Sequence, residues 1–184
     1  CAQAAKKGNQ VLGQLYRAVT YRDKVTFKNL YCTYVRTHLE YAVQAWSPWT
    51  NEDINLLEQV QRRMVRSISC LKGVTYEDKL TEIGLTTLEA RRRRGDLIEV
   101  YKIMTKKECA DPKTCFDLMF EMGNSSTRNV MGHLNIKRRA VRIDCRRYFF
   151  SVRVWQHWNE LDDVVKQAET TNEFKGRYDR YVKR

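Results

Sequence analysis

The chain has little proline and glycine, and no long apolar run. Its 184 residues include only two prolines and eight glycines, so few positions force a helix to break. No stretch approaches the roughly 20 apolar residues that cross a bilayer, and no basic-then-apolar start indicates a signal peptide. These absences predict a helical, globular, intracellular protein, nuclear and cytoplasmic, with no membrane partner.

Cysteine and histidine are too scattered to indicate a disulfide framework or a metal site. The six cysteines have no regular spacing, so reduced thiols are expected. Cys109, Cys115, His133 and Cys145 lack the close spacing of a zinc knuckle. We therefore predict no metal and no cofactor, and we assign His38 to the core because it lies on an apolar helical face.

Acidic residues are outnumbered. Lys and Arg total 34 against 22 Asp and Glu, a formal net charge of +12. A charge of this size favours an extended anionic partner, and with the membrane argued against, that partner is nucleic acid.

Helix-start signals recur along the chain. A threonine followed three residues later by a carboxylate lets each side chain satisfy a free N–H at a helix start. This pattern occurs at Thr50 and Asp53, Thr75 and Asp78, Thr86 and Glu89, and Thr170 and Glu173. We therefore predict a mainly α fold.

Residues 1–73 are predicted to form a three-helix unit. The first helix has an apolar face of Val11, Leu12, Leu15 and Val19. The second ends near Trp46, and its spacing of three and four predicts one face made of Phe27, Leu30, Tyr31, Tyr34, His38, Tyr41 and Ala45. The third opens at Thr50 and has the apolar stripe Ile54, Leu57, Val60, Met64 and Ile68.

Residues 74–184 are predicted to form a helical C-terminal region. Helices are expected over 75–83, 87–106 and 145–161 and from about Asn172, and turn formers allow a short helix over 116–119. Period-two alternation allows a small β-hairpin around Lys137, Arg138 and Arg139, with Val130, Leu134 and Ile136 in one strand and Val141, Ile143 and Cys145 in the other.

Three groups of basic residues are candidate nucleic-acid contacts. The first is Lys6, Lys7, Arg62, Arg63 and Arg66, of which the three arginines lie off the apolar stripe. The second is Arg91, Arg92, Arg93 and Arg94, which surround a helix and cannot share one solvent face. Phosphate contact and pairing with acids such as Glu77, Asp78 or Glu82 both stay open for these four.

The third group is Lys137, Arg138, Arg139, Arg142, Arg146 and Arg147. Basic residues beside aromatic ones suit a single strand. However, Phe150, Val154, Trp158 and Leu161 have core spacing, so we assign the aromatics Tyr148, Phe149 and Phe150 mainly to the core and only the basic residues to a ligand.

Several blocks occur in an order that resembles one family. They are KKGNQVLGQLYR, HLEYAVQAWSP, LEQVQRRMVRSI, TYEDKLTEIGLTTLEARRRRGDLIEVYKIM, CRRYFFSVRVWQHWNEL and NEFKGRYD. Together they resemble the thumb and C-terminal region of non-LTR (LINE-type, jockey-like) retrotransposon reverse transcriptases. Thr37 departs from the family, in which proline is usual at this place, and so does the turn after Leu161, which lacks proline.

The resemblance implies a non-catalytic part of an RNA-directed DNA polymerase. It would bind the backbone of RNA, DNA or an RNA–DNA hybrid beside upstream palm and fingers. The paired carboxylates that hold two metal ions in that palm are not expected here. The only adjacent aspartates, Asp162 and Asp163, follow Glu160 where the motif has an aromatic residue, so they predict a solvated helix-end turn.

The chain is thus expected not to be an enzyme on its own. The alternative is an orphaned or domesticated retroelement fragment that acts as a helical protein-interaction module.

Overall fold

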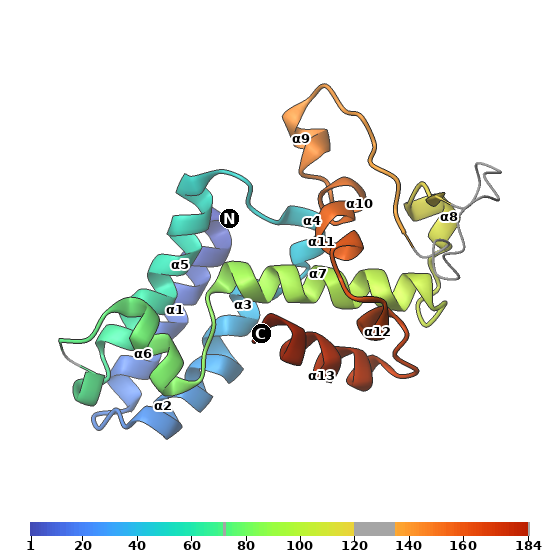
Figure 1. Cartoon of the computed structure of the whole chain (residues 1–184). Coiled ribbons are helices and arrows are strands. Elements are labelled where there is room, and N and C mark those ends of the chain that lie inside the picture. The colour runs from blue at the N-terminus through green and yellow to red at the C-terminus, as the bar shows by residue number, and fades with distance from the viewer. Residues whose placement is uncertain (72, 120–134, 184) are drawn as a thin grey trace. The chain divides into compact units, whose positions relative to one another are not determined.

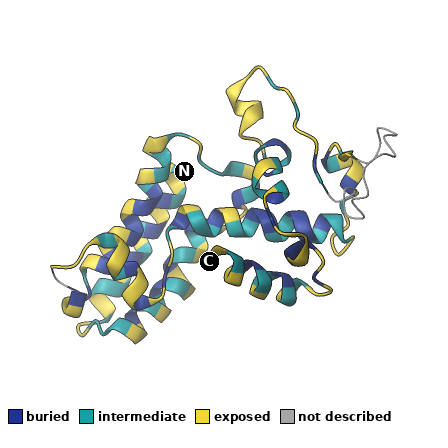
Figure 2. Cartoon of the chain, viewed as in Figure 1, coloured by how far each residue is buried: buried dark blue, intermediate teal, exposed yellow. Residues whose placement is uncertain are grey.

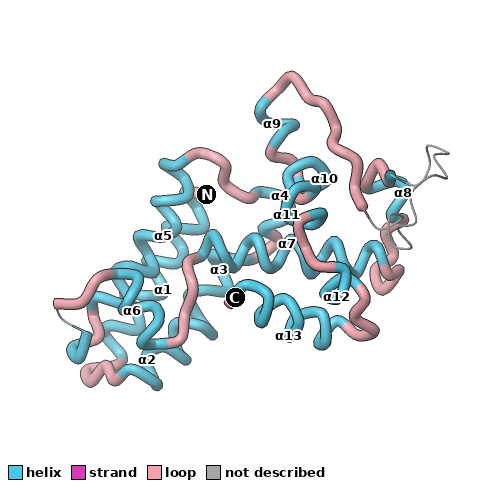
Figure 3. The backbone as a smooth tube through the Cα atoms, in the orientation of Figure 1, coloured by secondary structure: helices cyan, strands magenta, loops and turns pink. Residues whose placement is uncertain are grey.

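A computed structural model describes residues 1–71, 73–119 and 135–183, which form helices and connecting loops (Figures 1 and 3). Over these residues no strand is present, and one isolated antiparallel bridge joins Leu118 and Ile136. The predicted mainly α fold is confirmed. The chain divides into two compact units, Cys1–Arg93 and Arg94–Arg184.

The first unit is built from α1 (Ala2–Ala18), α2 (Lys24–Leu30), a π-helical turn (Tyr31–Val35), α3 (Arg36–Glu40), α4 (Val43–Trp46), α5 (Asn51–Arg66), a 3₁₀ turn (Ser69–Leu71) and α6 (Tyr76–Ile83). The helix α7 (Leu88–Met104) begins in this unit and continues into the second. The second unit then contains α8 (Pro112–Cys115), α9 (Asp144–Arg147), α10 (Phe150–Arg153), α11 (Trp155–Asn159), α12 (Asp163–Lys166) and α13 (Thr171–Val182).

Helices α1 and α5 pack together in the first unit, and buried and exposed residues alternate along each of them (Figure 2). Gly8 of α1 lets α3 approach most closely, because a Cβ there would lie 2.9 Å from Leu39 Cδ2 of α3 and 3.4 Å from Val60 Cγ1 of α5. The predicted α5 stripe is confirmed at Leu57, Val60, Met64 and Ile68, which are all buried, whereas Ile54 is half-buried.

The predicted helix from Asp23 to Trp46 is correct from Lys24 to Glu40, where the helical backbone continues through a π-helical turn, and wrong beyond it, because Tyr41 and Ala42 end the helix before α4. The buried residues recur every four positions, at Phe27, Tyr31, Val35, Leu39 and Val43. Four residues turn about 400° in an α-helix, so this stripe would drift around the helix. The wider i→i+5 turn counters the drift.

The predicted apolar face of this segment is wrong in its second half for the same reason. Tyr34 and Tyr41 are exposed and His38 is only half-buried. The core positions belong to Val35 and Leu39 instead.

Three of the four predicted threonine caps are present. Thr50, Thr75 and Thr170 each accept a hydrogen bond from the backbone N–H of the carboxylate residue three positions on. The fourth prediction is off by one residue, since Thr87 rather than Thr86 caps α7 by accepting from the N–H of Ala90 at 3.2 Å.

A buried polar network ties α5 to the segments on either side of it. Gln61 Nε2 donates to the Tyr76 hydroxyl and to the carbonyl of Thr86 at 3.1 and 3.0 Å, and its Oε1 accepts from the Tyr31 hydroxyl at 3.0 Å. Glu58 accepts from Tyr76 at 2.5 Å and from the N–H of Leu88 at 3.0 Å. Burial raises the pKa of Tyr31 and of Tyr76, so both hydroxyls stay protonated at neutral pH and can donate.

This network helps to explain why the unit boundary lies between Arg93 and Arg94 rather than at the predicted 73/74. Leu80, Ile83, Leu85 and Leu88 are buried in the same core as α1 and α5. The short α6 and the start of α7 therefore belong to the first unit.

The core of the second unit is aromatic. Phe174 of α13 stacks on Tyr101 of α7 with ring centroids 4.5 Å apart and lies 6.1 Å from Trp158 of α11. The Tyr101 hydroxyl donates to the carbonyl of Ala168 at 2.6 Å. These contacts join the ends of the unit across a long stretch of chain.

The sequence predicted several elements of this unit wrongly. The helix expected over 145–161 is broken into α9, α10 and α11, and Phe149 is extended between the first two. The short helix lies at α8, not at 116–119, because Asp111 caps it by accepting from the N–H of Lys113. Phe116 instead enters the core.

The predicted β-hairpin is also wrong over the described residues. Ile136 pairs with Leu118, and Asp144 to Arg147 form α9 rather than a strand. The side chain of Asn159 bonds both backbone groups of Ile136, which gives them partners without a second strand. Val130 and Leu134 lie outside the described residues.

Replacing Gln61 by Leu should destabilise the first unit by about 2 to 5 kcal/mol, because the buried Tyr31 hydroxyl and the carbonyl of Thr86 lose their hydrogen-bond partner. Gln59→Leu is the matched control, since Gln59 is exposed on the same helix and its change should fall within about 0.5 kcal/mol. Urea unfolding followed by circular dichroism measures both. Equal stability of the two variants would contradict a stabilising role for the network.

Candidate nucleic-acid interface

The arginines of α5 lie on its outer face. Arg62, Arg63 and Arg66 are exposed, whereas Gln61, Met64 and Val65 between them are buried. Their predicted position off the apolar stripe is confirmed. Over the described residues no carboxylate lies within ion-pair distance of these three guanidinium groups.

Arg62 and Arg66 border a small hollow with α6. The hollow has a volume of about 190 Å³ and is lined by these two arginines, Val65, Val74, Tyr76 and Lys79. The Arg62 guanidinium lies 4.7 Å from the centroid of the Tyr76 ring, and the Tyr76 hydroxyl is held by Glu58 and Gln61. A buried network thus fixes the ring on which one of the cations rests.

Three cations around one hollow, which we call the α5–α6 notch, suit a phosphate group. Sequence analysis missed Lys79, although its position three residues after Tyr76 places both on one face of α6. The spacing of Arg62 and Arg66 gives the same signal on α5.

Arg63 points to α1 instead of the notch. Its Nη1 donates to Asn9 Oδ1 at 2.9 Å, and its carbonyl accepts from the Tyr16 hydroxyl at 2.9 Å. Lys6 and Lys7 are exposed on α1, less than one turn before Asn9. These residues remain solvent-accessible cations of the first unit.

The four arginines at the start of α7 mainly take part in intramolecular contacts. Arg91 makes a two-pronged pair with Glu40, in which Nη2 lies 3.0 Å from Oε2, and these hydrogen bonds raise the pKa of Arg91. Arg94 pairs in the same way with Asp179, at 2.7 and 2.8 Å. Arg93 lies 3.6 Å from Glu89 in an exposed i,i+4 pair, and Arg92 is buried at 4% exposure.

This arrangement favours the intramolecular alternative for these four residues. The carboxylate partners of Arg91, Arg94 and Arg93 are Glu40, Asp179 and Glu89, rather than Glu77, Asp78 or Glu82, which the sequence offered as examples. The correct partners are far in sequence for Arg91 and Arg94, so helical spacing could not identify them.

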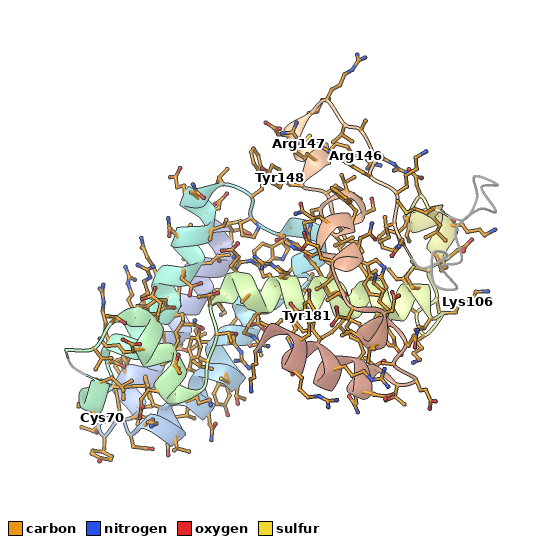
Figure 4. All side chains as sticks on the ribbon, viewed as in Figure 1. Cys70, Lys106, Arg146, Arg147, Tyr148 and Tyr181 are labelled. Carbon is orange, nitrogen blue, oxygen red and sulfur yellow. The ribbon has the colours of Figure 1, made fainter. Side chains whose placement is uncertain are left out.

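The third basic group lies in the second unit, where some of its members pair with carboxylates and others are exposed. Arg139 makes two hydrogen bonds to Asp117, which lower the pKa of that carboxyl group and keep it ionised. Arg147 lies 3.0 Å from Asp144 in an exposed pair. Lys137, Arg138, Arg142 and Arg146 are exposed, and Figure 4 shows Arg146, Arg147 and Tyr148 grouped at the end of α9.

The predicted core assignment of the neighbouring aromatics is wrong for two of the three. Tyr148 is 38% exposed and Phe149 is 50% exposed; both lie where the chain leaves α9, and the backbone of Phe149 is extended before α10. Phe150 does pack against the core of the second unit.

A larger pocket opens beside these residues, with a volume of about 800 Å³. It is lined by Arg138, Arg139, Arg147, Arg153, Tyr148 and Trp155, among others, and no carboxylate is among its described lining residues. Arg153 is fixed by two 2.9 Å hydrogen bonds to the buried carboxylate of Asp96. Sequence analysis missed Trp155, because it directly follows Val154, a residue with core spacing.

Three other expectations can be compared with the structure. Asp162 and Asp163 are exposed at the start of α12, as predicted for a solvated turn. Among the described residues no three His, Cys, Asp or Glu side chains are grouped to hold a metal, and His133 lies outside them. No helix in the described part of the chain is long and apolar enough to cross a membrane.

Comparison of the chain with protein-family models, with curated proteins and with solved structures gave no match. The family resemblance therefore stays a prediction from the sequence blocks.

A double-mutant cycle on Arg91→Gln and Glu40→Gln should give a coupling energy of about 1 kcal/mol, because both side chains are partly shielded from water. The exposed Arg93 and Glu89 pair is the matched control, for which about 0.3 to 0.5 kcal/mol is expected. Thermal unfolding of the single and double variants measures both. A coupling energy near zero for Arg91 and Glu40 would make Arg91 a candidate phosphate contact again.

Proposed function

We propose that the chain is the non-catalytic thumb and C-terminal part of a non-LTR retrotransposon reverse transcriptase, whose first unit binds the backbone of an RNA template paired with its cDNA. The observation that carries the proposal is the α5–α6 notch, where Arg62, Arg66 and Lys79 meet.

The chemistry of the notch supports contact with a nucleic-acid backbone. Its cations come from two helices that the buried network of Glu58, Gln61 and Tyr76 holds in place. Their geometry is therefore set before a ligand arrives, which lowers the ordering cost of binding. Charges of this kind position a backbone without distinguishing bases.

The distribution of charge supports the same partner. Residues 1–93 contain 15 basic and nine acidic residues, and residues 94–184 contain 19 and 13. Each unit thus has an excess of six positive charges, although several arginines are paired with carboxylates. An extended polyanion can use both.

Exposed aromatic residues favour the second candidate, a protein-interaction module. Tyr34 and Tyr41 lie on the surface of the first unit, and aromatic side chains are enriched at protein interfaces. Salt dependence separates the two candidates, because binding to a nucleic-acid backbone releases counterions in proportion to the number of phosphates that the protein neutralises.

Replacing Arg62, Arg63 and Arg66 together by Gln should weaken binding to an RNA–DNA hybrid about equally for all sequences. The slope of log K against log salt should shrink by roughly one unit for each phosphate that the variant no longer binds. Fluorescence anisotropy across a salt series measures this. An unchanged affinity and slope would overturn the proposed role of this face.

The matched control removes the same charge elsewhere, by changing Arg17, Arg180 and Lys183, which are all exposed, to Gln. It should alter the slope less. Met64→Ala tests the opposite case, since loss of this buried side chain should cost about 2 to 5 kcal/mol of stability and leave the salt slope unchanged while the protein is folded.

The purified chain should not extend a primer on an RNA template with nucleotides and Mg²⁺, because the palm carboxylates of the family are not among its residues. A primer-extension assay measures this against an active reverse transcriptase. Templated extension by the pure chain would contradict the assignment to the thumb and C-terminal region.

A further inference from the structure

The pocket of the second unit combines fixed cations with aromatic rings in a volume of about 800 Å³, within the range of roughly 300 to 1,000 Å³ that is usual for small-ligand sites. Its residues come from the loop before α9, from α9 and α10, and from α11. The proposed function, which concerns a duplex backbone at α5, leaves this pocket unexplained.

The arginines of the pocket have two different roles. Arg139 and Arg153 each make two hydrogen bonds to a carboxylate, Asp117 and Asp96 respectively. Arg153 also donates from Nη1 to the carbonyl of Tyr148 at 3.1 Å, so it holds the turn that carries this ring. These two arginines build the wall of the pocket and contribute little free charge.

Arg138 and Arg147 supply the charge that a ligand can use. The Arg138 guanidinium lies 5.6 Å from the centroid of the Trp155 ring, and no carboxylate lies within ion-pair distance of it over the described residues. Among the described residues Arg147 pairs only with Asp144, and both side chains are more than half exposed. Exposed ion pairs of this kind are weak, so a phosphate can displace the carboxylate.

The aromatic rings point to a planar ligand. Trp155 packs against the core of the second unit on one side and lines the pocket. Tyr148 lines the same pocket and is 38% exposed. A rigid ring beside a cation allows a base to stack while its phosphate is neutralised.

We propose that this pocket binds one unstacked base, with its flanking phosphates, of a single-stranded nucleic acid. A base within a duplex is stacked and paired, so its face cannot reach rings inside a pocket without first leaving the helix. An acidic peptide would use the arginines but gain nothing from base stacking on Tyr148. The inference is independent of the α5–α6 notch.

The test uses the whole chain and a fluorescein-labelled oligouridylate of about 12 nucleotides, a length typical of single-strand sites. The variant Tyr148→Ala with Arg138→Gln should weaken single-strand binding by roughly 5- to 100-fold, the range for loss of base stacking. Its affinity for a blunt RNA–DNA hybrid should stay within about twofold, because stacking on a pocket ring is not used by a duplex.

The matched control is Phe149→Ala with Arg180→Gln. Both residues are exposed, and neither is among the described lining residues of the pocket. This control should bind the oligouridylate like the parent. Circular dichroism verifies that both variants are folded.

Four results would overturn the inference. The first is parental single-strand affinity of the pocket variant, and the second is an equal loss in the control. The third is competition by polyglutamate that equals that of unlabelled oligouridylate, which would make the pocket a site for acidic protein. Competition by uridine monophosphate as strong as by the oligonucleotide would also contradict it, by assigning the pocket to a free nucleotide.

This test and the test of the proposed function can fail independently of each other. The α5 triple variant should retain most of its single-strand affinity, and the pocket variant should retain hybrid binding. If the α5 triple variant binds the hybrid like the parent while the pocket variant loses single-strand binding, only the proposed role of the α5–α6 notch is overturned.

Discussion

The buried side chains of Glu58 and Gln61 hold together four segments of the first unit. An amide and a carboxylate in a core are costly unless every polar atom has a partner. Here their partners are two tyrosine hydroxyls, the carbonyl of Thr86 and the N–H of Leu88. Because these partners lie on α6, at the start of α7 and on the π-helical turn, α5 can satisfy its core only if all of them are in place.

The same network sets the geometry of the α5–α6 notch. The hydroxyl of Tyr76 donates a hydrogen bond to the buried Glu58, and the ring of Tyr76 faces Arg62 on the surface. The position of Lys79, on the next turn of α6, follows from the position of Tyr76. A buried polar contact therefore determines how surface cations are spaced, which links the stability of the first unit to its proposed binding face.

Arginine has two uses in this protein, and exposure alone does not separate them. Arg91, Arg94, Arg139 and Arg153 form two-pronged pairs with carboxylates, so they act as structural links. Arg62, Arg66 and Arg138 border hollows, and Arg62 and Arg138 also lie over aromatic rings. The planar guanidinium serves both uses because it can bind a carboxylate edge-on and rest flat on a ring. The net charge of the chain thus overstates the charge that a ligand meets.

Local sequence patterns were enough to predict the mainly α fold, most helix starts and the outward position of the α5 arginines. These features depend on residues within one or two turns: Thr50 caps through the N–H of Asp53, and Arg62 avoids the stripe of Leu57 and Met64 by helical spacing alone. Local patterns suffice where the interaction is local. Four features could be found only from the folded chain: the carboxylate partners of Arg91 and Arg94, the π-helical turn, the unit boundary after Arg93 and the pocket around Trp155. Each depends on residues distant in sequence, such as Glu40 with Arg91 or Asp96 with Arg153. A local sequence pattern does not indicate which acidic residue lies nearest to an arginine in the folded protein. The free energy that selects these contacts comes from burying the core of each unit. It outweighs the intrinsic secondary-structure preference of any single segment.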